Sequence, residues 1–282
     1  MAEDSGQDTE VLERWRRAAS GWSSRADEVR DFGMPVSAWM IDQLALQPGQ
    51  RVLELAAGPG DTGFMAAELV NPGGTLISSD GVEPMLDIAR ERAGAMGISN
   101  VEFKQLDLEW IDLETASVDA LLCRWGLMFA PDPGSSLQEM RRVLRPGGRV
   151  ALAVWAAPEG NPWATIPTRA LIELGHVEPP DPNAPGMFVL ADAERLRELL
   201  DGAGFLEPVV EPIALMRTDD DVRHFIQGTL DLSAPLAEVH DRLSDEHWSE
   251  VEARIAELAQ PFATEDGRLA FPAVSLGAAA SS

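Results

Sequence analysis

The chain has 282 residues, 45% of them hydrophobic, which is enough to bury one large core. Acidic side chains outnumber basic ones by 47 to 22, and the net charge of −25 argues against nucleic acid or an anionic membrane as a partner. The single cysteine, Cys123, excludes an intrachain disulfide and, with only four histidines, argues against a metal site. The polar N-terminus is no signal peptide, and no apolar run reaches the ~18 residues of a membrane span. We therefore expect a cytoplasmic protein.

The first 47 residues predict a tail followed by helices. Residues 1–10 are acidic and polar, and they indicate a disordered tail. Residues 11–30 have a helical composition interrupted near Gly21, and residues 31–35 (DFGMP) indicate a turn. Residues 36–46 repeat apolar side chains at helical spacing, which predicts another helix.

Residues 48–157 alternate between short apolar runs and amphipathic segments. This order predicts a mainly parallel sheet with helices on both faces, as in a Rossmann-like α/β fold. We expect strands at 51–57, 75–80, 100–107, 118–125 and 149–156, and helices at 61–70, 83–97 and 135–144.

The alternation stops after Ala157. Residues 158–200 combine Pro/Gly-rich linkers with helical stretches and are interpreted as an insertion that covers the substrate. Residues 201–282 are interpreted as completing the sheet of the same single domain. Within them we expect strands near 205–217 and 271–280, and helices near 220–230 and 236–259.

The stretch VLELAAGPGDTG (52–63) begins within the first expected strand, and G-x-G-x-x-G follows its apolar run. Read by spacing alone, this loop cradles the pyrophosphate of a dinucleotide. A pyrophosphate favours a helix N-terminus without nearby anions, yet Glu54 and Asp61 lie in this stretch. These carboxylates instead favour a cationic nucleoside such as S-adenosylmethionine (SAM). An NAD-dependent oxidoreductase remains the weaker alternative.

Four segments then resemble, in order, the class I SAM-dependent methyltransferases of the ubiquinone/menaquinone-biosynthesis-like group. They are VLELAAGPGDTG, LISSDGVEPMLDIARERA, FKQLDLEWIDLETASVDALLCRWGLMFAPDP and EMRRVLRPGGRVALAVW. The resemblance covers roughly residues 15–156 and is loose beyond them. It implies a doubly wound, seven-stranded sheet with an N-terminal helical lid, SAM as methyl donor, S-adenosylhomocysteine (SAH) as product and a small-molecule acceptor. A SAM-binding protein that performs another reaction, or only binds, is the alternative.

The resemblance also implies how the cofactor is held. Asp80 would bind both ribose hydroxyls, Asp107 the adenine amino group and the Leu108 N–H the adenine ring, on which Met85 would pack. The Arg124 carbonyl would accept from the cofactor's ammonium. The full expected set is Glu54, Ala56, Gly58, Gly60, Asp80, Gly81, Met85, Asp107, Leu108 and Arg124.

Some roles stay open at this point. Glu54 either holds the loop by accepting backbone N–H groups or faces the ammonium through water. The Arg124 side chain pairs with Glu54 or another acid, or meets an acidic substrate. The sequence departs from the family at Ala56, where glycine is common, and at Gly81, where an apolar residue is more usual.

The acceptor is expected to be apolar or aromatic because tryptophans and a methionine flank the expected cavity, although such residues are often ordinary core. The expected substrate-pocket residues are Trp22, Trp125, Met128 and Trp163. The chain has no tyrosine, so His176 is the candidate general base, the alternative being a surface histidine. The catalytic residue therefore stays unassigned. Cys123 lies in an apolar strand and is expected to be an inert core thiol.

Overall fold

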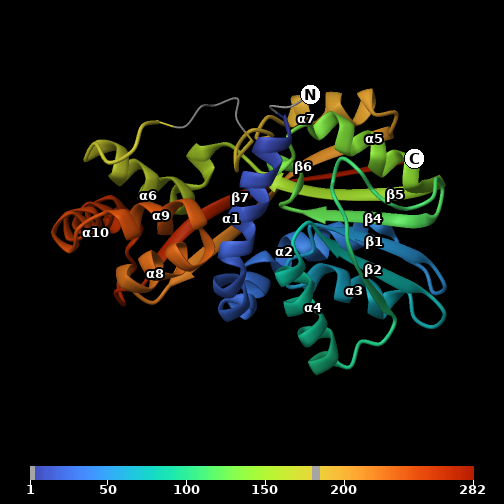
Figure 1. The fold of residues 1–282 in the computed structure, drawn as a ribbon, viewed down its shortest axis with the longest axis horizontal. Helices are drawn as coiled ribbons and strands as arrows, with labels where there is room; N and C mark the ends of the chain where they lie inside the picture. Colours follow the sequence, from blue (N-terminus) through green and yellow to red (C-terminus); the bar gives the residue numbers. More distant parts are fainter. Residues whose placement is uncertain (1–3, 180–184) are drawn as a thin grey trace.

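The computed structural model describes residues 4–179 and 185–282, and its centre is a seven-stranded sheet in the order β3-β2-β1-β4-β5-β7-β6. Neighbouring strands are parallel except where β7 pairs antiparallel with β5 and β6. Helices cover both faces of the sheet (Figure 1). The predicted doubly wound fold is thus confirmed. The strands are β1 (Arg51–Leu55), β2 (Thr75–Asp80), β3 (Val101–Gln105), β4 (Val118–Arg124), β5 (Leu144–Trp155), β6 (Leu206–Asp219) and β7 (Leu269–Ser281).

The helices follow the expected order from α3 onward, except that the stretch expected as one helix at 236–259 is two helices, α9 and α10. Asp132 caps α5 by accepting the N–H groups of Gly134 and Ser135, and Gly97 ends α4 with a φ of 72°. The helices are α1 (Asp4–Ser24), α2 (Ala26–Leu44), α3 (Asp61–Leu69), α4 (Glu83–Met96), α5 (Pro133–Val143), α6 (Pro162–Glu173), α7 (Ala193–Gly202), α8 (Val222–Leu232), α9 (Ala234–Arg242) and α10 (Asp245–Ala259), with 3-10 turns η1 (Leu127–Phe129), η2 (Pro158–Gly160) and η3 (Gln260–Phe262).

The N-terminal expectations were partly wrong. Helix α1 begins at Asp4, although residues 1–10 indicated a disordered tail, and residues 1–3 lie outside the described chain. Acidic residues near a helix start interact favourably with its dipole, so acidity alone did not mean disorder. The expected turn at 31–35 lies inside α2, which contains Pro35 in its interior. Glycine and proline misled the prediction because both usually end helices.

A second group of helices lies beside the sheet. Helices α6, α8, α9 and α10 gather at one side of the molecule, and α1 runs between them and α4 (Figure 1). Their buried side chains form a separate apolar cluster that includes Phe225 of α8, Val251 of α10 and Phe271 of β7. We call these four helices the cap. Residues 201–282 therefore complete the sheet with β6 and β7 and also insert three cap helices between them.

The expected insertion at 158–200 contributes α6 to the cap and α7 to the sheet, and its residues 180–184 lie outside the described chain. Across the described residues, no helix is both long and apolar enough to cross a lipid bilayer.

Candidate functional site

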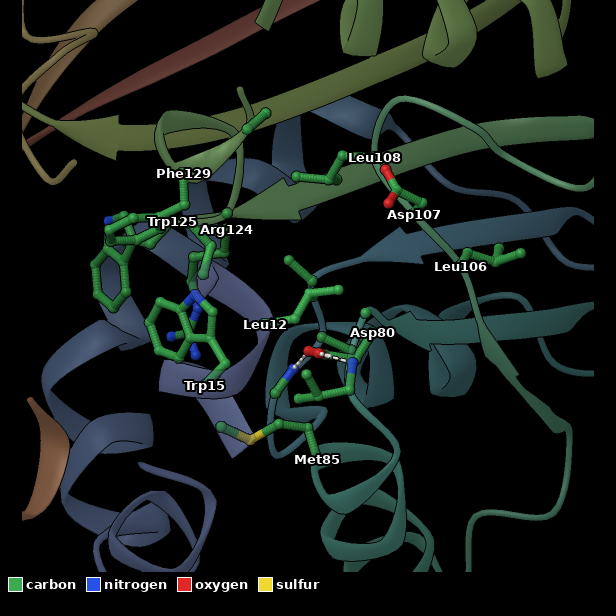
Figure 2. A pocket seen from close by; sticks show the side chains of 18 of the residues that line it. Leu12, Trp15, Asp80, Met85, Leu106, Asp107, Leu108, Arg124, Trp125 and Phe129 are labelled. Atoms are coloured by element: carbon green, nitrogen blue, oxygen red, sulfur yellow. Dashed lines mark hydrogen bonds between the residues drawn. The ribbon is translucent and has the colours of Figure 1, made fainter. Parts of the chain in front are cut away.

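A cavity opens where the strand order reverses, beyond the carboxyl ends of β1 and β4. Open α/β sheets bind ligands at such a reversal. Figure 2 shows Asp107 and Leu108 at one end of the cavity and Trp15, Trp125 and Phe129 at the other. The cavity is lined by Val11, Leu12, Trp15, Trp22, Glu54, Ala56, Ala57, Gly58, Pro59, Asp80, Gly81, Val82, Met85, Leu106, Asp107, Leu108, Arg124, Trp125, Gly126, Phe129, Ala130 and Pro131.

The glycine loop between β1 and α3 turns sharply. Gly58 and Gly60 have φ angles of 53° and 87°, in the left-handed region that favours glycine. A Cβ atom on Gly60 would also lie 2.5 Å from the Phe64 ring. Ala56 has a φ of 50°, so it adopts a glycine-like conformation although it carries a Cβ atom.

Glu54 holds this loop from beneath. Its Oε1 accepts the Gly63 N–H at 2.7 Å, and its Oε2 accepts the Ser78 hydroxyl at 3.1 Å. A Cβ atom on Gly63 would lie only 2.1 Å from Glu54 Oε2, so the third glycine of the motif makes room for a carboxylate rather than a pyrophosphate. The first of the two alternatives for Glu54 thus holds in this structure, and Glu54 also lines the cavity.

Burial raises the pKa of the Glu54 carboxyl to about 8, despite the hydrogen bonds from Gly63 and Ser78 that lower it. The side chain is 2% exposed, which explains the size of the desolvation. A nearby cation would favour the ionised form and lower this pKa.

Asp80 ends β2 and faces the cavity, where two backbone groups orient its carboxylate (Figure 2). The Gly58 N–H donates to Oδ2 at 2.9 Å and the Val82 N–H to Oδ1 at 3.1 Å. A carboxylate has about four acceptor positions, so two remain for hydroxyl donors such as those of a ribose. Burial raises the pKa of Asp80 to about 6, against the lowering effect of these N–H groups.

The expected adenine residues lie further along the same edge. Asp107 follows β3, is exposed, and accepts the Glu109 N–H at 2.8 Å. This hydrogen bond stabilises the turn and leaves other acceptor positions of the carboxylate for a ligand. Leu108 and the buried Met85 line the cavity beside it. Among the ten expected cofactor residues, Gly60 alone is absent from the lining, because its contribution is to the turn.

Two of the four expected substrate residues line the cavity and two do not. Trp22 and Trp125 line the cavity, and the Trp125 indole N–H donates to Ser275 Oγ at 3.0 Å. Met128 is 1% exposed and packs in the core, and Trp163 stacks edge-on against Trp155 at 5.0 Å, so both lie outside the lining. They follow β4 and β5 as expected, but they pack against the core and are not part of the cavity lining.

His176 lies after α6 in the cap, where its ring is 5.5 Å from that of His247, and it does not line the cavity. Cys123 is buried, and burial raises the pKa of its thiol to about 12, in keeping with an inert core thiol. The lining residues absent from the predicted set include Val11, Leu12, Trp15 and Phe129. The first two belong to the apolar face of α1, whose helical spacing was the available signal.

The donor set fits SAM better than a dinucleotide. Three carboxylates, Glu54, Asp80 and Asp107, line the cavity against one cation, Arg124. Carboxylates attract a sulfonium and an ammonium and repel a pyrophosphate. Among the described residues, no three His, Cys, Asp or Glu side chains are grouped to hold a metal ion.

Comparison with known proteins also indicates a methyltransferase. Residues 46–164 match the family model described as a methyltransferase domain. Residues 46–164 therefore form a class I SAM-dependent methyltransferase domain. The methyltransferase is 28% identical over 176 residues to the ubiquinone/menaquinone biosynthesis C-methyltransferase UbiE of Cellvibrio japonicus, covering 59% of this chain and 71% of that protein. Identity to UbiE of Ectopseudomonas mendocina is 34% over 123 residues, or 43% of this chain and 48% of the relative.

Solved structures share the fold of this methyltransferase. The YcgJ protein of Bacillus subtilis superposes with a TM-score of 0.55 at 19% identity, over 87% of this chain and 97% of that one. The [4+2]-cyclase SpnF superposes with a TM-score of 0.54 at 18% identity, over 87% and 79% of the two chains. Because the fold also occurs in a cyclase, the fold alone does not define the reaction. The family match and the donor set identify SAM as the methyl donor and SAH as the product.

Proposed function

We propose that this methyltransferase moves the methyl group of SAM to a small, apolar or aromatic acceptor by in-line displacement. The supporting observation is the aromatic end of the cavity, where Trp15, Trp125 and Phe129 lie opposite Asp107. Aromatic walls bind flat apolar rings through stacking and edge contacts. The relatives named above are C-methyltransferases of ubiquinone and menaquinone biosynthesis, which is consistent with such an acceptor.

SAM supplies a methyl group that is already activated on a positively charged sulfur. The protein's task is therefore to align the acceptor and exclude water. In this proposal Asp80, Asp107 and Glu54 hold and orient the nucleoside, and Trp15 and Phe129 close the aromatic end. Trp15 packs edge-on against Phe129 with ring centroids 5.1 Å apart, so helix α1 contributes directly to the acceptor wall.

The titratable side chains that line the cavity are Glu54, Asp80, Asp107 and Arg124. His176 lies outside this group, so we assign no histidine general base. The acceptor in this proposal carries a nucleophile that reacts without one, such as an acidic phenol or an enolised carbon. A cytoplasmic location is part of the proposal, because a lone buried cysteine suits a reducing compartment.

The test has two stages. Calorimetric titration with SAH and with NADH is expected to show binding of SAH alone. Methyl-labelled SAM is then incubated with phenols, naphthols, aliphatic alcohols and polar amines, and mass spectrometry identifies products. Transfer to aromatic acceptors supports the proposal, whereas transfer confined to polar amines contradicts it. SAH binding without transfer to any acceptor favours a SAM-binding protein with another activity.

A matched pair of variants sharpens the second stage. Trp15→Ala is expected to lower kcat/KM for the aromatic acceptor while leaving SAH affinity within a few-fold. Trp110→Ala is the control, because Trp110 is 74% exposed and lies outside the cavity lining.

A further inference from the structure

Arg124 presents a cation that the protein leaves largely unpaired. It ends β4 and lines the cavity, partly buried, with its guanidinium 4.8 Å from the centre of the Trp125 ring. Within the described chain, its one hydrogen bond is from Nη1 to Ser37 Oγ at 3.3 Å, and no carboxylate lies within 4 Å. The Asp61 and Glu54 carboxyls attract this cation electrostatically without a direct hydrogen bond to it. A guanidinium has five N–H donors, so most of them have no acceptor in the protein.

Helix α2 is shaped around this side chain. A Cβ atom on Gly33 would lie 2.0 Å from Arg124 Nη1, so a larger residue there would displace the guanidinium from its present position. Ser37 is buried, and its hydroxyl pairs with that of Thr62 at 2.9 Å as well as accepting from Arg124. The guanidinium is therefore held by α2 on one side, and its remaining N–H donors can bind a ligand.

The glycine loop offers little to an anion. Four of its N–H groups are already used inside the protein: Ala57 donates to Ser79 O at 2.9 Å, Gly58 to Asp80, Gly60 to Ala57 O at 2.9 Å and Gly63 to Glu54. Pro59 has no N–H. A carboxylate entering this cavity therefore finds these four loop donors occupied, and Arg124 is the one cationic side chain in the lining.

We propose that the Arg124 guanidinium is the carboxylate-binding site of the cavity. The carboxylate belongs either to the methionine part of the cofactor or to an acidic acceptor, and both present the same fork of two oxygens to the guanidinium. The proposal rests on the binding of SAM by this cavity and, in its second form, narrows the proposed acceptor to an aromatic acid.

The first experimental arm tests the cofactor. Calorimetry measures the affinity of wild type and R124M for SAH and for decarboxylated SAH, which keeps the amine and lacks only the carboxylate. If the cofactor is the source, R124M weakens SAH binding by roughly 10- to 100-fold and leaves the decarboxylated analogue unchanged.

The second arm tests the acceptor. SAH-saturated protein is titrated with 4-hydroxybenzoate and with its neutral counterpart, 4-hydroxybenzamide. If the acceptor is the source, wild type prefers the carboxylate, R124M loses that preference, and SAH affinity is unchanged in R124M. Either pattern supports the carboxylate site and identifies its ligand.

The site is ruled out if R124M weakens SAH and its decarboxylated analogue equally, or if neither arm responds. Failure of wild type to bind SAH would instead count against the methyltransferase function itself. R145M is the matched control, because Arg145 pairs with Asp119 at the opposite end of the sheet and changes the net charge equally. If R124M does not fold, R124K retains the charge and is expected to lose the forked geometry, and therefore several-fold in affinity for the carboxylate.

Discussion

Cofactor binding should release a proton from Glu54. With a pKa of about 8, this carboxyl is about nine-tenths protonated at pH 7 when no cofactor is bound. A unit positive charge within about 6 Å, at an effective dielectric constant of about 20, favours the ionised form by about 3 kcal/mol. That energy equals about two pKa units, which leaves the carboxyl mostly ionised in the complex. We therefore expect binding of SAM at pH 7 to release between about half a proton and one proton.

The measurement is isothermal titration calorimetry in buffers with different ionisation enthalpies, where the slope of the observed heat gives the number of protons released. SAH lacks the sulfonium charge and is expected to release fewer protons than SAM. E54Q should release none from this site, while its amide oxygen can still accept the Gly63 N–H. E68Q, at an exposed position of α3, removes the same charge and serves as the control. Equal proton release by wild type and E54Q would refute the reasoning.

The same carboxyl sets a pH dependence of stability. Because folding raises the pKa of Glu54, the unfolded chain releases its proton at lower pH than the folded one. The free energy of unfolding should therefore fall as pH rises from about 4.5 to 8, by on the order of a few kcal/mol from this group. Chemical denaturation across this range is expected to show a flatter profile in E54Q, and parallel profiles would contradict the assignment.

Two further predictions test the cavity and its lid. D80N keeps the shape of the carboxylate and removes its charge, so the affinity for SAH should fall by roughly 10- to 100-fold. The loss in D107A should be smaller because Asp107 is exposed. Unchanged affinity in both variants would argue against SAM binding at these strand ends. G21A would place a Cβ atom 1.8 Å from Asp231 O in α8, so the free energy of unfolding, measured by thermal denaturation, should fall by about 1–3 kcal/mol. G202A is the control, because a Cβ atom there meets open space and the free energy of unfolding should fall far less.

The sequence predicted most of the residues that line the carboxylate-rich end of the cavity, because its information there is local. Each strand end carries its carboxylate within one or two residues of the apolar run, so Glu54, Asp80 and Asp107 could be placed without knowing the fold in detail. The parallel order then brings these positions to one edge. The close approach of Gly63 to Glu54 was not predicted, because it depends on how β1 packs against α3.

The acceptor half could not be predicted as fully, because it depends on long-range packing. Gly33 indicated a turn, but its lack of a side chain accommodates Arg124, which is 91 positions later in the chain. Trp163 and Met128 have the composition of a substrate wall and are turned into the core instead. Their direction depends on how the cap meets the sheet, which periodicity does not encode.

Strand β7 contacts both the cap and the residues that line the cavity. Near its start, Phe271 packs against Phe225 of the cap with ring centroids 4.6 Å apart, and four residues later Ser275 accepts the indole N–H of Trp125. The cap is therefore not a detachable module that could be exchanged between homologues to transplant acceptor preference. A graft that shifts the register of β7 would also move the Trp125 indole. Domain exchanges intended to alter acceptor selectivity should therefore transfer β6, the cap helices and β7 together.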